Sequence, residues 1–300
     1  MIPDEKTLLI GKVLKDSTKP LKERFRALFT LKNIGGKTAI NCISEAFADE
    51  SALLKHELAY CLGQMKDVDA NEILSKVLED KNQEPMVRHE AAEALGAIGD
   101  ANSISILEKY AQDPVKEVSE TCYLALKRIK SMTVVDSNKK DNANIYGSVD
   151  PAPPLEDVSD INKLKEILLD ENEDLFMRYK AMFKLRDINS VESTLALTEG
   201  LSHGSSLYRH EVAFVLGQMQ NPSSIPALTS ALEDQSQNEM VRHECAEALG
   251  AIATPECYQV LKKYLKDEKV VVRESCEIAL DMCDYENSFE LQYADTLCKV

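Results

Sequence analysis

The chain has 300 residues, 44% hydrophobic and 29% charged, which is enough apolar material for a core and excludes a chain that is disordered throughout. Only 6% of the residues are aromatic, Trp is absent, and 35 basic against 51 acidic residues give a net charge of -16. A surface this acidic repels phosphate backbones and anionic lipids, so we expect neither nucleic acid nor membrane as a partner, and a cationic ligand or basic protein is favoured.

The sequence also bears on location. It contains no apolar run near the roughly 20 residues that cross a bilayer, and its start, Met-Ile-Pro-Asp-Glu-Lys, lacks the basic-then-apolar order of a secretory signal. The eight cysteines form no Cys-x-x-Cys pair, and several occupy apolar helical positions, as reduced core thiols do. We therefore expect a cytoplasmic protein.

The chain is duplicated at an offset of 154 residues. Residues 83–98 read QEPMVRHEAAEALGAI and residues 237–252 read QNEMVRHECAEALGAI, with differences only at 84, 85 and 91. Within each half, the pattern Val-Arg-x-x-Ala-x-x-Ala-Leu-Gly returns at spacings of 31, 33 and 31 residues. A period of this length with two amphipathic stretches per unit is typical of stacked helix pairs, so the sequence predicts an all-α solenoid of eight HEAT-like repeats, four per half.

Local signals mark the helices in chain order. Gly35 and Gly99 each follow an apolar stretch, and Ser51 and Ser205 each precede the second helix of their repeat. Serine suits a helix N-cap and glycine a C-terminus. We divide the chain into a first half at 1–130, a flexible tether at 131–160 rich in turn formers and Pro, and a second half at 161–300.

Histidine is confined almost entirely to one place in the repeat. Four of the five His are followed by Glu, in the same two columns of the two central repeats of each half: His56-Glu57, His89-Glu90, His210-Glu211 and His243-Glu244. The other repeats hold Phe25-Arg26, Glu120-Thr121, Tyr179-Lys180 and Glu274-Ser275 there. Dyads 33 residues apart fall on neighbouring second helices about 8–10 Å apart, so two His and two Glu per half form a candidate N2O2 metal site.

Adjacent helical residues diverge by about 100°, so the His and Glu of one dyad need not bind the same ion, and Glu57 and Glu211 could instead bind substrate or act as a base. The Arg before three of the dyads also occurs in repeats without a dyad, which indicates a structural function, and we interpret His203 as a solvated loop residue.

Mixed His and carboxylate ligands suit Fe, Mn or Zn, and two such sites facing each other favour a dinuclear catalytic centre over a structural one. Two alternatives have different chemistry. One is a HEAT-like scaffold for partner proteins with at most structural metal, and the other is a di-zinc or di-manganese hydrolase.

Eight HEAT-like repeats, a Pro-containing tether and four in-register His-Glu dyads closely resemble the deoxyhypusine hydroxylase family over essentially the whole chain. The resemblance implies a non-haem di-iron monooxygenase, with two iron ions whose Fe2+ form reacts with O2. It further implies hydroxylation of the deoxyhypusine side chain of a translation factor, the final step of hypusine formation.

The resemblance also assigns the site residues, and no catalytic residue is expected beyond the metal centre. It implies iron binding by the four His and by Glu90 and Glu244, with Glu57 and Glu211 as further ligands or substrate contacts. Deoxyhypusine is a cationic polyamine, which an acidic chain suits, and Glu120 and Glu274 are hypothetical contacts of its amines.

Overall fold

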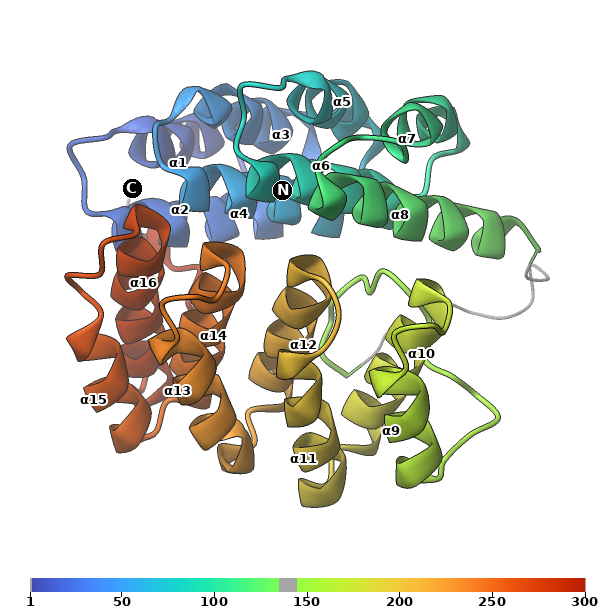
Figure 1. Ribbon diagram of the computed structural model, residues 1–300. Helices are drawn as coiled ribbons and strands as arrows, with labels where there is room; N and C mark the ends of the chain where they lie inside the picture. The colour runs from blue at the N-terminus through green and yellow to red at the C-terminus, as the bar shows by residue number, and fades with distance from the viewer. Residues whose placement is uncertain (1, 135–144, 300) are drawn as a thin grey trace. The chain divides into compact units, whose positions relative to one another are not determined.

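The computed structural model describes residues 2–134 and 145–299, and within these residues it contains helices and no strand. The α-helices form eight successive pairs, four in each half of the chain (Figure 1). Every dyad column predicted from the repeat lies on the second helix of a pair. The predicted all-α solenoid of HEAT-like repeats is confirmed.

The first compact unit comprises Met1–Pro151 together with Leu291–Val300. Its first helices are α1 (Asp4–Lys15), α3 (Gly36–Glu45), α5 (Asn71–Glu79) and α7 (Ile104–Tyr110), and its second helices are α2 (Leu21–Ile34), α4 (Ala52–Gln64), α6 (Pro85–Ile98) and α8 (Lys116–Val134). Each first helix packs on the second helix of its pair, and the second helices pack on one another in chain order. Short 3-10 helices connect them at η1 (Ala46–Ala48), η2 (Val68–Ala70) and η3 (Ala101–Ser103), and η6 (Thr296–Cys298) lies in the C-terminal segment.

The second compact unit comprises Ala152–Glu290 and repeats this arrangement. Its first helices are α9 (Ile161–Leu169), α11 (Val191–Glu199), α13 (Ile225–Glu233) and α15 (Pro255–Lys263), and its second helices are α10 (Leu175–Ile188), α12 (Ser206–Met219), α14 (Glu239–Ile252) and α16 (Val270–Glu286). The connecting 3-10 helices are η4 (Gly200–Ser202) and η5 (Pro222–Ser224).

The predicted helix ends are confirmed. The side chains of Ser51 and Ser205 accept hydrogen bonds from the backbone N–H groups of Leu54 and Tyr208, as N-caps do. Gly35 and Gly99 are the C-caps of α2 and α6, each with a positive φ.

The arginine of the repeat pattern joins the two helices of a pair. The Nε of Arg88 donates to the Leu78 carbonyl at 3.0 Å, and its guanidinium pairs with Asp113 of the next repeat at 2.7 Å. Arg24, Arg178 and Arg242 make the same bond to a carbonyl ten residues back. Because these four guanidinium groups satisfy the end of a first helix from inside the core, the structural function is confirmed for them. Arg209 and Arg273 donate instead to the loop carbonyls of Gly204 and Asp267.

The segment predicted as a tether, 131–160, is described only in part, since 135–144 lie outside the described residues. Helix α8 continues to Val134. After the gap, the Val149 N–H donates to the Gln64 side chain at 2.8 Å in the first unit, and Ala152 is buried in the second. In the described part of the chain, no helix has the length and apolar character needed to cross a membrane.

Candidate metal sites

The four His-Glu dyads occupy equivalent positions on α4, α6, α12 and α14. In each case His is the fifth residue of its helix. All eight side chains are buried, with exposed fractions between 0% for His89 and His243 and 8% for Glu57. Polar side chains without a function normally remain in contact with water at the surface. The burial of all eight side chains therefore indicates a shared function in each unit.

In the first unit, the dyads of α4 and α6 meet. The His56 and His89 ring centroids are 5.4 Å apart, and the Nε2 of His56 lies 3.3 Å from an oxygen of Glu90. The three side chains each offer one donor atom, and these atoms all lie within 4.8 Å of one another. This is the geometry of a compact N2O ligand set.

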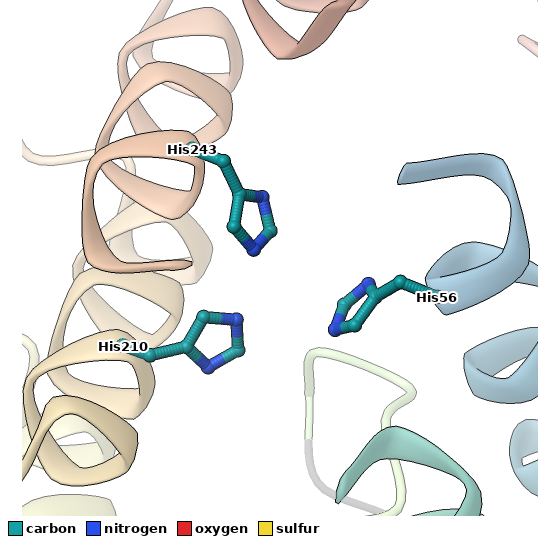
Figure 2. A group of neighbouring side chains, drawn as sticks. All are labelled: His56, His210 and His243. Carbon is teal, nitrogen blue, oxygen red and sulfur yellow. The ribbon is translucent and has the colours of Figure 1, made fainter. Parts of the chain in front are cut away.

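In the second unit, the corresponding side chains on α12 and α14 also approach one another, and His243, Glu244 and Glu247 form a group whose donor atoms all lie within 4.8 Å of one another. The His210 and His243 ring centroids are 5.2 Å apart, and the Nε2 of His210 lies 3.2 Å from an oxygen of Glu244. Figure 2 shows the rings of His210 and His243 reaching from neighbouring helices with their distal nitrogens turned toward each other; the picture also labels His56 of the first unit.

In each unit, the His of one dyad approaches the Glu of the next. His56 meets Glu90, and His210 meets Glu244, each on the following second helix. This follows from the divergence of adjacent side chains on a helix. Among the described residues, the compact groups of three donors include Glu90 in the first unit and both Glu244 and Glu247 in the second, while Glu57 and Glu211 are buried without belonging to such a group.

The donor atoms fit a transition-metal ion. Two ligand atoms that each lie about 2.1 Å from one ion at near right angles are about 3 Å apart. The His56–Glu90 and His210–Glu244 distances of 3.3 and 3.2 Å match this separation. Imidazole and carboxylate together suit iron, manganese or zinc. The chain therefore holds His/Glu clusters that can bind a metal.

Close helix packing sets the distance between the paired histidines. A Cβ added to Gly63 of α4 would lie 2.7 Å from the Ala94 Cα of α6, and one added to Gly217 of α12 would lie 3.0 Å from the Ala248 Cα of α14. The backbones approach because neither glycine has a side chain. This contact brings the two rings of each pair within reach of one ion.

Sequence reasoning missed one pair of carboxylates, Glu93 and Glu247. They follow Glu90 and Glu244 by three residues, so the signal was the pattern His-Glu-x-x-Glu in both copies of the duplicated segment. An oxygen of Glu247 lies 3.6 Å from the Nδ1 of His243. Burial raises the pKa of Glu93 well above its usual range, and the nearby Glu90 raises it further.

His203 lies apart from these clusters. It follows η4, its side chain is 43% exposed, and its Nδ1 is 3.6 Å from an oxygen of Glu171. The interpretation as a solvated loop residue is confirmed.

Comparisons with known proteins agree with the fold and the repeat. A model of HEAT repeats matches residues 81–137 and 194–281. Deoxyhypusine hydroxylase of Drosophila melanogaster is 60% identical over 300 residues, covering 100% of this chain and 99% of the relative. The enzyme of the same name from Gallus gallus is 54% identical over equal coverage. The solved structure of human deoxyhypusine hydroxylase is 55% identical, with a TM-score of 0.91 over 94% of this chain and 97% of the human one.

Proposed function

Because the chain belongs to the deoxyhypusine hydroxylase family, we propose that it hydroxylates the deoxyhypusine side chain of a translation factor with molecular oxygen, completing hypusine. One observation of this chain supports the proposal most directly. Two buried His pairs with a neighbouring Glu occupy equivalent places in the two halves, each with a His Nε2 about one ligand–ligand distance from a carboxylate oxygen.

We propose that each cluster holds one iron ion. His56, His89 and Glu90 would bind one ion, and His210, His243 and Glu244 the other. Bound iron supplies the redox capacity that insertion of an oxygen atom into an unactivated C–H bond requires, with the second oxygen atom leaving as water and two electrons coming from an external reductant.

The buried carboxylates have two further proposed functions. Glu57 and Glu211 are additional ligands or contacts of the substrate, and in either function their negative charge favours a cationic neighbour. Glu120 and Glu274 occupy the same columns in the following repeats and are proposed contacts of the substrate amines. Because the deoxyhypusine chain is cationic, carboxylates along its path would hold it by charge-assisted hydrogen bonds.

We place the protein in the cytoplasm. Seven cysteines of the described part of the chain are free and buried. Burial raises the pKa of Cys122 and of its repeat equivalent Cys276 to about 12, so these thiols stay protonated and unreactive. Such thiols suit a reducing compartment. We also retain the division into halves at 1–130 and 161–300, joined through 131–160, as a proposal.

The test is metal analysis joined to an isotope assay. Protein reconstituted anaerobically with ferrous iron should hold two ions per chain and transfer one atom from labelled O2 to a deoxyhypusine-containing substrate. A His203→Ala variant is the matched control, because this loop histidine lies outside both clusters, and it should retain full metal content and activity. Iron that does not bind, or activity with zinc in the absence of oxygen, would overturn the proposal and favour the scaffold or the hydrolase.

A further inference from the structure

We infer that Glu247 is a positioning residue: its carboxylate fixes the ring of His243 so that the distal nitrogen of that ring faces the metal. The inference rests on the proposed metal-binding function of His243. It adds a residue that acts on the ion through a ligand.

The contact arises on one face of α14. Glu247 follows His243 by four residues, so the two side chains lie one above the other on the helix. The Oε1 of Glu247 lies 3.6 Å from the Nδ1 of His243, whose ring is completely buried. A fixed carboxylate at this distance attracts a proton on Nδ1 and so selects the tautomer that leaves Nε2 with its lone pair.

A second helix holds the carboxylate in place. The hydroxyl of Ser275 on α16 donates to the same Oε1 of Glu247 at 3.3 Å. Ser275 is completely buried, and α14 and α16 pack against each other. Glu247 is therefore fixed from α16 while it contacts His243 on α14, which is the arrangement expected of a carboxylate that orients a ligand.

The orientation agrees with the metal cluster. Figure 2 shows the distal nitrogen of His243 turned toward His210, whose Nε2 lies 3.2 Å from Glu244. Since Glu247 lies at the Nδ1 side of the ring, the ring has one nitrogen for the carboxylate and one for the ion. A carboxylate on the outer nitrogen of a ligating histidine raises its basicity and typically contributes 10–100-fold to metal affinity.

The first unit offers a matched control. Thr121 occupies the column of Ser275, but its hydroxyl donates to the Glu117 carbonyl of its own helix at 2.8 Å. Thr121→Ala therefore removes an equivalent buried hydroxyl without removing a bond to a carboxylate near a histidine.

The experiment is an anaerobic titration of full-length protein with ferrous iron, which resolves the two sites by their affinities. We expect Glu247→Ala to weaken one of the two sites about 10–100-fold. Glu247→Gln should lose clearly less, because the amide oxygen can still lie at the Nδ1 side of the ring and attract its proton. Ser275→Ala should weaken the same site by a smaller factor, and Thr121→Ala should change neither site.

Two results would overturn the inference. Unchanged affinity in Glu247→Ala would show that the contact does not act on the metal. An equal loss in Glu247→Gln and Glu247→Ala would make Glu247 itself a ligand, since an amide replaces a coordinating carboxylate poorly. Melting of the metal-free variants controls for folding, and Ser275→Ala carries the test if Glu247→Ala does not fold.

A failure of the proposed function can be distinguished from a failure of this inference. If the wild-type protein binds no iron, or if His243→Ala binds as much iron as the wild type, the proposed metal site is wrong. If the wild type binds two ions, His243→Ala loses iron and the Glu247 variants keep wild-type iron affinity, the metal site stands and the positioning function of Glu247 is wrong.

Discussion

The two halves carry nearly the same metal-site segment in different surroundings. Residues 83–98 and 237–252 differ at three positions, and the His–His ring separations, 5.4 and 5.2 Å, are nearly equal. The neighbouring helix differs, because Ser275 donates to Glu247 whereas its equivalent Thr121 bonds to its own helix. The duplicated segment thus determines the ligand cluster, while the next repeat determines what supports it.

The same contrast appears just before the dyads. Lys55, which precedes His56, pairs with Glu84 at 2.9 Å, whereas Arg209, which precedes His210, donates to Gln237 at 3.2 Å and to the Gly204 carbonyl. An ion pair in one half is replaced by neutral acceptors in the other. The equivalent dyads therefore lie in unequal electrostatic environments.

The largest effect is expected from loss of one histidine in each half. His56→Ala and His210→Ala should each lower the iron content from two ions to one and reduce hydroxylation by more than about 100-fold, because removal of a ligand exceeds the effect of removing its support. Iron analysis and the labelled-oxygen assay measure both. If one variant retained both ions, the two clusters would not be equivalent sites.

The next effect concerns the buried pairs Arg88–Asp113 and Arg242–Asp267. Burial alone would raise the pKa of either aspartate, but hydrogen bonds from arginine and from a backbone N–H hold the pKa of both below the usual value. Asp113→Ala and Asp267→Ala should each lower the free energy of unfolding by about 3–5 kcal/mol, because the remaining arginine is left buried without its carboxylate partner. Urea unfolding measures the cost at neutral pH.

These pairs also set a pH dependence. Because the folded pKa of each aspartate is depressed, its contribution to stability is complete above the unfolded pKa of about 3.9. The contribution is lost as the pH falls through the folded pKa. Unfolding of the metal-free protein followed from pH 5 to pH 2 should show this loss, and an Asp113→Asn, Asp267→Asn double variant should show a shallower one.

A smaller effect is expected at the helix contacts. Gly63→Ala should destabilise the protein by about 1–3 kcal/mol, because its Cβ would overlap the Ala94 backbone. Gly217→Ala should cost less, since its added Cβ would lie 3.0 Å from the nearest atom instead of 2.7 Å. Iron affinity should fall in the same order if backbone approach sets the distance between the rings. Equal or reversed orders in urea unfolding would contradict this link.

The smallest effect concerns one helix end. Gly99 ends α6 with φ +77°, and its equivalent Ala253 ends α14 with φ +56°. The left-handed conformation is less favourable for alanine than for glycine. Ala253→Gly should therefore stabilise the protein by about 1 kcal/mol, and Gly99→Ala should destabilise it by a similar amount. Thermal unfolding of the two variants is the measurement, and a lower melting temperature for Ala253→Gly would contradict the argument.

The repeat and the burial of the His-Glu dyads on equivalent helices could be predicted from the sequence because both are periodic. A buried Arg and a His-Glu dyad return at fixed spacing, which places them on the same helix of successive pairs. The pairing of His56 with Glu90 could not be predicted, because it depends on the distance between α4 and α6 that Gly63 and Ala94 allow.

Contacts between distant parts of the sequence also escaped prediction. The support of Glu247 by Ser275 requires the packing of α16 on α14. Residues 291–300 follow the second half in the sequence but pack with the first unit. Arg26 of α2 stacks over Tyr293 and pairs with Asp295 at 3.3 Å, and no periodic signal marks these contacts.

The C-terminal segment has a consequence for synthesis of the chain. The Thr296 N–H donates to the Thr30 hydroxyl at 3.2 Å, and both Arg26 and Thr30 are buried. The first helix pair emerges from the ribosome before the second unit, but residues 291–300, which pack on it, are made after that unit. The first unit therefore lacks part of its packing until residues 291–300 have left the exit tunnel, so a nascent chain stalled before residue 291 should leave α2 more accessible to proteases.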